Sequence, residues 1–407
     1  MKSDRWALSV VLAGSAAGAL GETMLLVAVN VLMLTRTHSA PAVALLWVVP
    51  QVATLATGTL VGRWTDRWDK RRTLWTSNAL GGIVVLGLLI TPNAWAIYGV
   101  FGLFAVVDGV FRAAFNPYFR LLVPAPMRVR ANAINGALHY GALVVGPAIA
   151  GALLLTERPD TVIGAVAAAL LVSAGCLFFI PSLNGPRSDR PGTAQHGMGA
   201  WWQDLRSVAD FLRGSGTVAG VVLLFRFTLV FGATADAQEV VFARRALHLG
   251  SSGYGLLVSV AGVGYALGAV ATWLLAERVP VRFLVGIGSV GAALGYLGYA
   301  LAPGFLWAAA GLLALGVCQA AAATGFGAFT QGALPPEAMG RITASVQALF
   351  AGLTIATTAG GGLLVGHVGV RLWMVGATGA MVLSAAVLAV VSLSRAGSRE
   401  FQRAAVS

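Results

Sequence analysis

The segment GRWTDRWDKRR, at positions 62–72, is the most densely charged stretch of an otherwise apolar chain. Its eleven residues include five cations and two carboxylates: Arg63, Asp66, Arg67, Asp69, Lys70, Arg71 and Arg72. Long apolar runs flank it, at 41–62 and 74–91, and a helix needs about 20 apolar residues to cross the hydrocarbon core of a bilayer. The segment is therefore expected to be a short polar loop between two membrane-spanning helices.

The composition of the whole chain indicates that its solvent is lipid. Charged residues make up 10% and hydrophobic residues 57% of the 407 positions, against roughly 25% and 45–50% in soluble domains. The net charge of +12 does not indicate a nucleic-acid partner, because the cations lie between apolar runs and form no basic face with interleaved aromatics. Cys176 and Cys318 lie within apolar runs, so no disulfide framework is expected.

Twelve apolar runs predict an all-α integral membrane protein with twelve transmembrane helices. The runs cover 7–34, 41–62, 74–91, 94–118, 131–155, 161–181, 217–242, 253–275, 283–301, 304–328, 342–366 and 370–394. The start, MKSDRW, leads into the first run without a clear cleavage site, which predicts a retained first span. The predicted domains are a six-helix half at 1–181, a cytoplasmic linker that can form an amphipathic helix at 182–216, a second half at 217–394 and a tail at 395–407.

The distribution of Lys and Arg predicts the orientation of the helices. If the N-terminus is cytoplasmic, 20 of the 27 cations fall in cytoplasmic gaps or tails, five on the opposite side and two within spans. This imbalance follows the positive-inside rule. Both termini are therefore expected on the cytoplasmic side of a cell membrane, and the 25 Arg against 2 Lys are typical of a GC-rich bacterial genome.

The two groups of six runs are related by a repeat with a constant offset of 211 residues. The offset aligns Asp66 with Glu277, Arg67 with Arg278, Arg71 with Arg282, Pro92 with Pro303, Pro124 with Pro335, Arg130 with Arg341 and Gly151 with Gly362. One offset that holds in three separate loops predicts two pseudo-symmetric halves derived from a common unit. Parallel repeats of this kind occur in secondary transporters, whose substrate site lies near the bilayer midplane between the repeats.

Residues 62–74 follow the pattern G-x-L-A-D-R-x-G-R-K-x-x-L at Gly62, Asp66, Arg67, Lys70, Arg71 and Leu74, and depart from it at Trp64 and Asp69. With this motif the chain resembles the major facilitator superfamily over essentially its whole length. The resemblance implies that the motif's Asp and Arg latch cytoplasmic helix ends together in the outward-open state. Asp66 would then lie near the positive N-terminus of span eleven. A role in membrane topology alone is the alternative for the five cations.

The stretch GALVVGPAIAG, at 141–151, places Gly141, Gly146, Pro147 and Gly151 in span five. Glycines spaced around a proline predict a bent helix that packs closely against a partner. The stretch resembles the family motif associated with proton-coupled exporters. The phrases DRWDKRR, NPYFRLLVPAPMRVRANAING and LPPEAMGRITAS most resemble the branch that contains macrolide-efflux and enterobactin-exporter proteins.

Ionisable residues within the spans are the candidate proton-coupling sites, because each charge costs at least a few kcal/mol there. Glu22 lies in the middle of span one with no cation within a helical turn, so it is expected to take up a proton near neutral pH. A neutral Glu22 bonded to a neighbouring helix is the alternative. Asp108 and Arg112, four residues apart, share a helix face as a cavity-lining or a structural ion pair. His139 is a candidate proton relay.

Four further polar residues within the spans are candidates for lining a substrate cavity: Asn30, Gln51, Arg226 and Asp236. Polar side chains in membrane helices more often bond neighbouring helices than ligands. Asp236 and Glu239 also approach the outer end of span seven, where solvation is the simpler interpretation.

These features predict a secondary active transporter that exports amphipathic small molecules, such as drugs, macrolides or siderophores, in exchange for protons by alternating access. The alternatives are an uptake symporter or a lysolipid-type carrier. A membrane enzyme or a non-transporting receptor is less favoured: the chain has no G-x-x-x-x-G-K-[ST] loop and no H-E-x-x-H. We expect no cofactor and no metal, a proton gradient as the energy source, and a monomer whose partners are substrate, protons and the bilayer, without nucleic acid.

Overall fold

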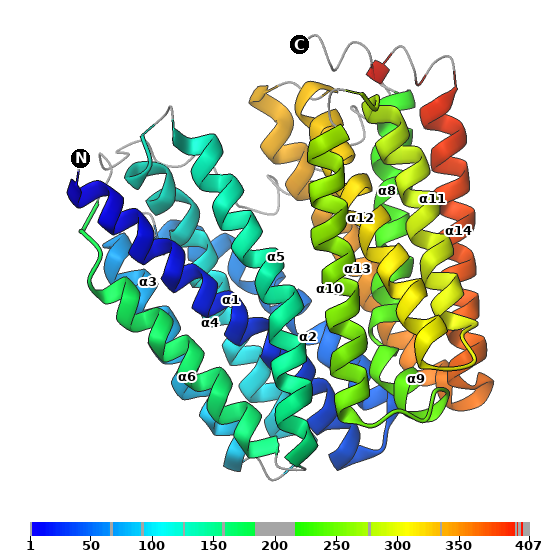
Figure 1. Cartoon of the computed structure of the whole chain (residues 1–407), viewed down its shortest axis with the longest axis horizontal. Helices are drawn as coiled ribbons and strands as arrows, with labels where there is room; N and C mark the ends of the chain where they lie inside the picture. Colours follow the sequence, from blue (N-terminus) through cyan, green and yellow to red (C-terminus); the bar gives the residue numbers. More distant parts are fainter. Residues whose placement is uncertain are drawn as a thin grey trace. The chain divides into compact units, whose positions relative to one another are not determined.

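The computed structural model describes residues 2–65, 68–90, 93–124, 127–156, 159–183, 216–275, 278–333, 336–394, 397 and 400–401. Within these ranges the chain is helical with short connections and contains no strand (Figure 1). The predicted all-α class is therefore confirmed.

Each of the twelve predicted spans coincides with a helix or with a helix and a short continuation of it. The first six are α1 (Lys2–Thr37), α2 (Ala40–Thr65), α3 (Lys70–Leu86) continued by η1 (Gly87–Ile90), α4 (Ala94–Leu122), α5 (Arg128–Leu153) continued by η3 (Leu154–Thr156), and α6 (Pro159–Phe178). The last six are α8 (Gly216–Asp236) followed by α9 (Glu239–Arg245), α10 (Ser251–Leu275), α11 (Val281–Ala300), α12 (Phe305–Ala333), α13 (Pro336–Val368) and α14 (Val370–Leu393).

The helices have the length and the apolar composition of membrane spans. Among the described residues, eleven are long and apolar enough to cross a bilayer, and the described side chains of α2 add a shorter apolar helix at Ala40–Ala53. The protein is therefore a multi-pass membrane protein. Prolines lie inside α2, α4 and α5, at Pro50, Pro117 and Pro147. Neighbouring helices can satisfy the backbone groups that a proline frees within a membrane.

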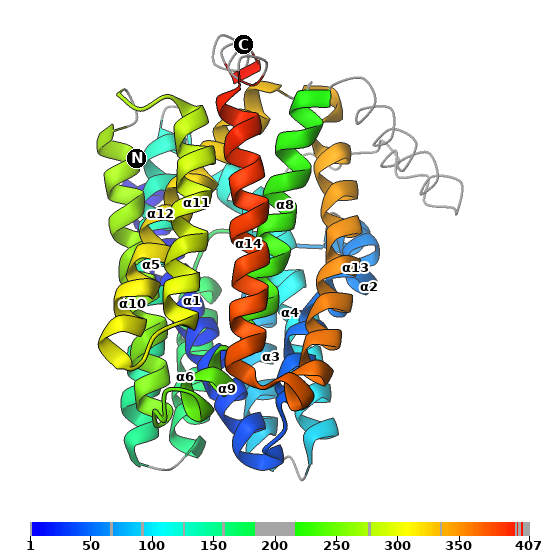
Figure 2. The same cartoon turned by 90° about the vertical axis from the view of Figure 1, so that its right-hand side faces the viewer.

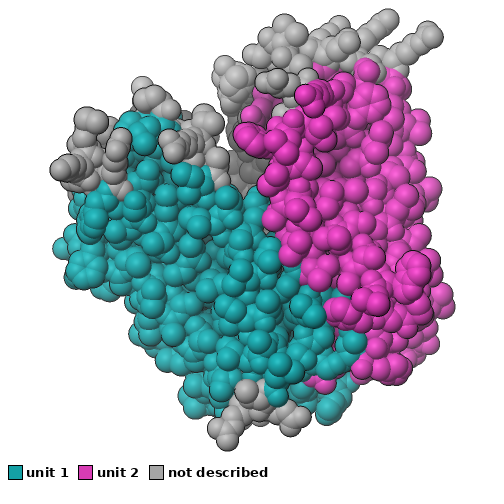
Figure 3. Space-filling model, viewed as in Figure 1, with its two compact units in different colours: residues 1–192, 249–259 teal, residues 193–248, 260–407 magenta. Residues whose placement is uncertain are grey.

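The chain forms two compact units, which Figure 3 shows in different colours. Unit 1 comprises residues 1–192 and 249–259, and unit 2 comprises residues 193–248 and 260–407. Residues 184–215, which contain most of the predicted linker, lie outside the described residues, and so does most of the predicted tail. The predicted domain boundaries thus stay a prediction.

Each unit has its own packed core. In unit 1, α1 packs against α5 and α6, and α3 packs against α4 and α6. A cluster of buried side chains around Phe115, Tyr118 and Phe119 of α4 fills the space between these helices. In unit 2, α14 packs against both α8 and α11 (Figure 2), around buried residues that include Phe225 and Phe329. These helices hold the polar groups of each unit in place.

Candidate functional site

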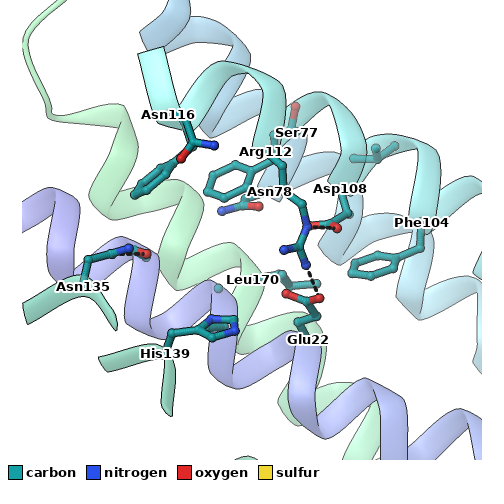
Figure 4. A pocket seen from close by; sticks show the side chains of 17 residues that line it. Glu22, Ser77, Asn78, Phe104, Asp108, Arg112, Asn116, Asn135, His139 and Leu170 are labelled. Carbon is teal, nitrogen blue, oxygen red and sulfur yellow. Dashed lines mark hydrogen bonds and ion pairs between the residues drawn. The ribbon is translucent and has the colours of Figure 1, made fainter. Parts of the chain in front are cut away.

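Unit 1 contains a cavity of about 240 Å³ lined by five helices (Figure 4). Its polar lining comes from Ser15 and Glu22 of α1, Ser77 and Asn78 of α3, Asp108, Arg112 and Asn116 of α4, and Asn135 and His139 of α5. Its apolar lining includes Phe104, Phe111 and Phe115 of α4 and Leu170 of α6. All four predicted proton-coupling residues line this one cavity: Glu22, Asp108, Arg112 and His139.

The guanidinium of Arg112 joins the two carboxylates of the cavity. Its Nε donates a hydrogen bond to Asp108 Oδ2 over 2.6 Å, and its Nη2 donates to Glu22 Oε1. Figure 4 shows the guanidinium between the two carboxyl groups. The first contact joins residues four apart on α4, as predicted, while the second ties α4 to α1. The three side chains therefore form one ionic cluster across two helices.

The pairing of Glu22 with Arg112 corrects the expectation that Glu22 has no partner. Sequence spacing finds only cations on the same helix, and the partner of Glu22 lies 90 residues away. The cluster is not sealed in the core, because the side chains of Arg112, Glu22 and Asp108 are 53%, 36% and 24% exposed. Water and small ligands can therefore reach the ion pairs.

A close crossing of α1 and α5 fixes the position of the helix turn that carries Glu22. Thr23, the next residue, donates its hydroxyl hydrogen towards Ala142 O of α5, at 3.0 Å, and also lies within bonding distance of two carbonyls of α1. A Cβ atom on Gly146 would lie 2.0 Å from Thr23 Oγ1. Only glycine at 146 allows the two helices to approach this closely.

Among the other residues of the span-five motif, Pro147 and Gly151 pack against another helix and Gly141 does not. A Cβ atom on Gly151 would lie 3.1 Å from Ser252 O, and a Cβ atom on Gly255, near the start of α10, would lie 2.7 Å from Pro147 O. Gly141 has nothing within 4 Å. The motif therefore brings α5 against α1 at Gly146 and against the first turns of α10 at Pro147 and Gly151.

Several polar cavity residues were missed by the sequence analysis. Ser15 Oγ donates to Asn135 Oδ1 over 2.9 Å, and Asn78 Nδ2 donates to Ser173 Oγ over 2.7 Å. Ser15 lies seven residues before Glu22, and Asn135 lies four before His139, so helical spacing alone would place each on the same face as a predicted residue. That periodicity is the signal that could have found them.

The predicted substrate-cavity residues do not join this cluster. Asn30 is buried, donates to Leu26 O and accepts a hydrogen bond from Trp47 Nε1 over 3.2 Å, so it bonds α1 to α2. Gln51 is half-buried on α2 and does not line the cavity. In unit 2, the guanidinium of Arg226 lies 6.0 Å from the centre of the Phe326 ring.

Asp236 is the last residue of α8. Residues 237 and 238 then interrupt span seven before α9 begins. Its carboxylate accepts a hydrogen bond from the hydroxyl of Tyr296 on α11, and Tyr296 is 2% exposed. The sequence suggested that Asp236 is simply solvated. In the structure it is instead bonded to the buried hydroxyl group of Tyr296. Glu239, also half-buried, opens α9 three residues later.

Part of the charged loop is described and has a structural role. Asp69 accepts a hydrogen bond from the backbone N–H of Arg72 over 2.8 Å, which caps α3, and it also accepts one from Ser182 Oγ. Capping explains why this chain carries Asp where the family motif has Gly. Arg71 donates to Phe178 O at the end of α6. Asp66 and Arg67 lie outside the described residues, Gly62 is described only in its backbone, and Lys70 begins α3.

No group of three or more His, Cys, Asp or Glu side chains that could hold a metal occurs among the described residues.

The family model of the Major Facilitator Superfamily matches residues 11–240 of the chain. The chain belongs to this superfamily. It is accordingly a membrane transporter of the major facilitator type, and the cluster of Glu22, Asp108 and Arg112 lies in the matched part.

Curated relatives agree with this family. The uncharacterized MFS-type transporter YfiS of Bacillus subtilis is 24% identical over 380 residues, which are 90% of this chain and 88% of YfiS. The enterobactin exporter EntS of Citrobacter koseri is 25% identical over 291 residues, 69% of this chain and 66% of EntS. The predicted branch of the superfamily is thus confirmed at the level of these two similarities.

Solved structures show the same fold at low sequence identity. A bacterial homologue of the human lysosomal transporter Spinster, inward-facing and occupied, has a TM-score of 0.74 at 15% identity, over 96% of this chain and 97% of that one. The nucleoside transporter NupG has a TM-score of 0.70 at 13% identity, over 97% and 100%. A transporter of the POT family reaches 0.76 at 11% identity, over 95% and 96%.

Proposed function

We propose that this transporter is a proton-coupled exporter of amphipathic small molecules. The observation that carries the proposal is the cluster of Glu22, Asp108 and Arg112 at the wall of the unit 1 cavity. Charged groups within membrane spans are costly, and they mark ion and substrate pathways. Alternating access would then move the two repeats around a site near the midplane.

The shared guanidinium gives protonation a mechanical consequence. When Glu22 takes up a proton, it loses most of its attraction to Arg112, which retains Asp108 on its own helix. The ionic contact between α1 and α4 then opens. Deprotonation restores it. Proton binding would thereby change the distance between two helices that line the cavity, which is what coupling to transport requires.

Export rather than uptake is supported by two similarities. The span-five stretch at 141–151 resembles the motif of proton-coupled exporters, and EntS, a relative over 69% of this chain, is an enterobactin exporter. We also propose a monomer in the cell membrane with both termini cytoplasmic, which the distribution of Lys and Arg supports. An uptake symporter or a lysolipid-type carrier would use the same fold.

The proposal is tested by compound accumulation in an efflux-deficient bacterium. Cells expressing the wild type, Glu22→Gln and the matched carboxylate control Asp160→Asn, at the exposed start of α6, receive macrolides, lipophilic cations and catecholate siderophores. We expect lower accumulation of at least one compound with the wild type and the control, and loss of that effect with Glu22→Gln or a protonophore. Wild-type accumulation equal to that of empty cells for every compound would contradict export.

A further inference from the structure

Arg371 lies at a position that ordinarily disfavours a cation. It is the second residue of α14, and the first turn of a helix is the positive end of the helix dipole. The predicted orientation also places it among the five cations on the outer side, against the positive-inside rule. At the equivalent position of the first repeat, 211 residues earlier, α6 carries Asp160, whose charge suits a helix N-terminus. The arginine at 371 is therefore expected to be there for the contacts that it makes.

The guanidinium of Arg371 binds the carboxyl ends of two other helices. Its Nη1 donates a hydrogen bond to Ala302 O over 3.0 Å, and its Nη2 donates to Ala246 O over 3.3 Å. Ala246 is the C-cap of α9, and Ala302 follows the C-cap of α11. The last carbonyls of a helix lack intrahelical donors and form the negative end of its dipole. One side chain of α14 thus caps both α9, which lies beside the lower end of α14 in Figure 2, and α11.

A break in span seven separates α9 from α8. At Gln238 the backbone N–H bonds three residues back, to Ala235 O over 2.9 Å, in a tight turn between the two helices. α9 ends at Arg245 and is followed by five residues outside any helix, so it is a short rigid element between two irregular segments. The equivalent residues of the first repeat, 26 and 27, lie within the unbroken helix α1. The repeat with the broken span carries the arginine, and the repeat with the unbroken span carries an acid in its place.

A row of buried aromatic side chains continues from Arg371 to the break. The Cζ atom of Arg371 lies 5.5 Å from the centre of the Phe242 ring on α9, and the Phe242 ring lies 5.0 Å from that of Tyr299 on α11. Tyr299 lies 5.9 Å from Tyr296, which bonds Asp236 at the end of α8. The three aromatic residues are at most 2% exposed, whereas Arg371 is exposed. Among the contacts of this row, the bonds of Arg371 are therefore the ones that water can replace.

We propose that Arg371 is a positioning residue: it clamps α9 to α11 and α14, and α9 opens and closes as an independent segment at the end of span seven during transport. A rigid element between two irregular segments moves through changes in a few backbone angles at its ends. The exposed bonds of Arg371 allow the release that such a movement needs. The inference goes beyond the proposed exchange with protons and holds for either direction of transport.

Backbone hydrogen exchange tests the clamp without a known substrate. The purified full-length protein in detergent is transferred to D₂O, and peptides from α8, α9, α11 and α12 are compared by mass spectrometry. We expect the amides of 239–247 to exchange at least about tenfold faster in Arg371→Gln than in the wild type, because two charge-assisted bonds are lost. The amides of α8 and α12 should be unchanged. Arg371→Lys should give an intermediate rate, because an ammonium group lacks the planar fork that reaches two carbonyls.

The matched control changes the charge at the equivalent position of the first repeat. Asp160→Asn should leave the exchange of 239–247 as in the wild type. Equal exchange of this segment in Arg371→Gln and the wild type would overturn the clamp. A rise of the same size in all four peptides would overturn it as well, since that is a general loss of stability and not the opening of one segment.

A covalent clamp tests the role of the movement in transport. In a Cys176→Ala, Cys318→Ala background, the cysteines of Ala246→Cys and Arg371→Cys are joined by a short, reducible bifunctional reagent. We expect joining to protect 239–247 from exchange and to lower the flux of a compound that the wild type exports at least about tenfold, with recovery on reduction. Equal flux in the joined and the reduced protein would overturn the role in transport. A wild type that exports no compound contradicts the proposed function alone, and the exchange comparison still decides the clamp.

Discussion

Both units carry carboxylates within their spans, but they surround them differently. In unit 1, Glu22 and Asp108 share Arg112 at the wall of an accessible cavity. In unit 2, Asp236 accepts a hydrogen bond from the buried Tyr296, and no salt bridge to it occurs among the described residues. In unit 1, the ion pair between Glu22 and Arg112 is accessible to water and can dissociate. In unit 2, the carboxylate of Asp236 is bonded to a buried hydroxyl group. We therefore expect proton coupling at the carboxylates of unit 1 and not at Asp236.

The internal repeat makes the contrast sharper. The offset of 211 residues that aligns the loops places Glu22 on Ala233, Asp108 on Gln319 and Arg112 on Ala323. The repeated scaffold was kept while the charged cluster exists in one copy only. Asymmetry of this kind suits a transporter in which one repeat binds the coupling ion and both repeats move.

The largest expected effect is that of removing the shared cation. Arg112→Gln leaves two carboxylates without a counter-ion, which costs about 3–5 kcal/mol in a buried site and less here because the Arg112 side chain is 53% exposed. We expect a transport rate at least about tenfold lower, equivalent to about 1.4 kcal/mol. The measurement is the initial flux of an exported compound in proteoliposomes.

The matched control for Arg112 is Arg226→Gln in unit 2. Arg226 contacts the Phe326 ring at 6.0 Å and makes no salt bridge among the described residues. We expect its flux to remain within about threefold of the wild type, because the half-buried Arg226 does not line the unit 1 cavity and cation–ring contacts contribute about 0.5–2 kcal/mol. Equal losses for the two arginine variants would remove the distinction between the units.

The close crossing of α1 and α5 should tolerate no side chain at 146. Gly146→Ala places a methyl group 2.0 Å from Thr23 Oγ1, and overpacking of this kind costs about 1–3 kcal/mol. We expect the midpoint of thermal unfolding in detergent to fall by about 2–5 °C. Gly141→Ala, in the same motif with nothing within 4 Å, is the control. A drop at 141 as large as at 146 would contradict the packing argument.

Loss of the phenol in unit 2 should affect stability more than coupling. Tyr296→Phe leaves Asp236 without its described hydrogen-bond donor, which costs about 1–3 kcal/mol for a buried group. We expect a lower unfolding midpoint and a pH-gradient-driven flux within about threefold of the wild type. If Tyr296→Phe or Asp236→Asn abolished the gradient-driven flux, unit 2 would hold a second coupling site.

The smallest expected effect belongs to the bond between α1 and α2. Trp47→Phe removes the hydrogen bond from the indole Nε1 to Asn30 Oδ1, worth about 0.5–1.5 kcal/mol. We expect a slightly lower unfolding midpoint and an unchanged flux. Asn30→Ala also removes the bond to Leu26 O and should lower the midpoint further, but it should leave the flux unchanged because Asn30 lies outside the cavity. A strong loss of flux with either variant would restore Asn30 as a substrate contact.

The sequence predicted the fold well because hydrophobic runs, prolines and the distribution of charge are local signals. Each of the twelve spans appears as expected, apart from the break after Asp236 that divides span seven into α8 and α9. The i, i+4 pair of Asp108 and Arg112 was predicted on the same ground. The bond from Arg112 to Glu22 was not, because it depends on how α1 and α4 pack and no spacing in the sequence encodes that.

The role of Gly146 shows the same limit. The motif at 141–151 predicted close packing of span five, yet only the structure distinguishes Gly146, pressed against Thr23, from Gly141, which faces open space. Composition predicts that a helix will be approached closely, and tertiary packing decides at which residue. Helical periodicity could have predicted the cavity residues Ser15 and Asn135, since each shares a helix face with a predicted residue.

The central claim is that Glu22 couples proton movement to substrate movement. It is tested most directly in proteoliposomes containing the wild type or Glu22→Gln, with pH-gradient-driven accumulation and substrate counterflow measured on the same preparation. We predict that Glu22→Gln, a permanent mimic of the protonated state, retains counterflow and loses gradient-driven accumulation. Accumulation driven by the pH gradient at the wild-type level in Glu22→Gln would contradict the account.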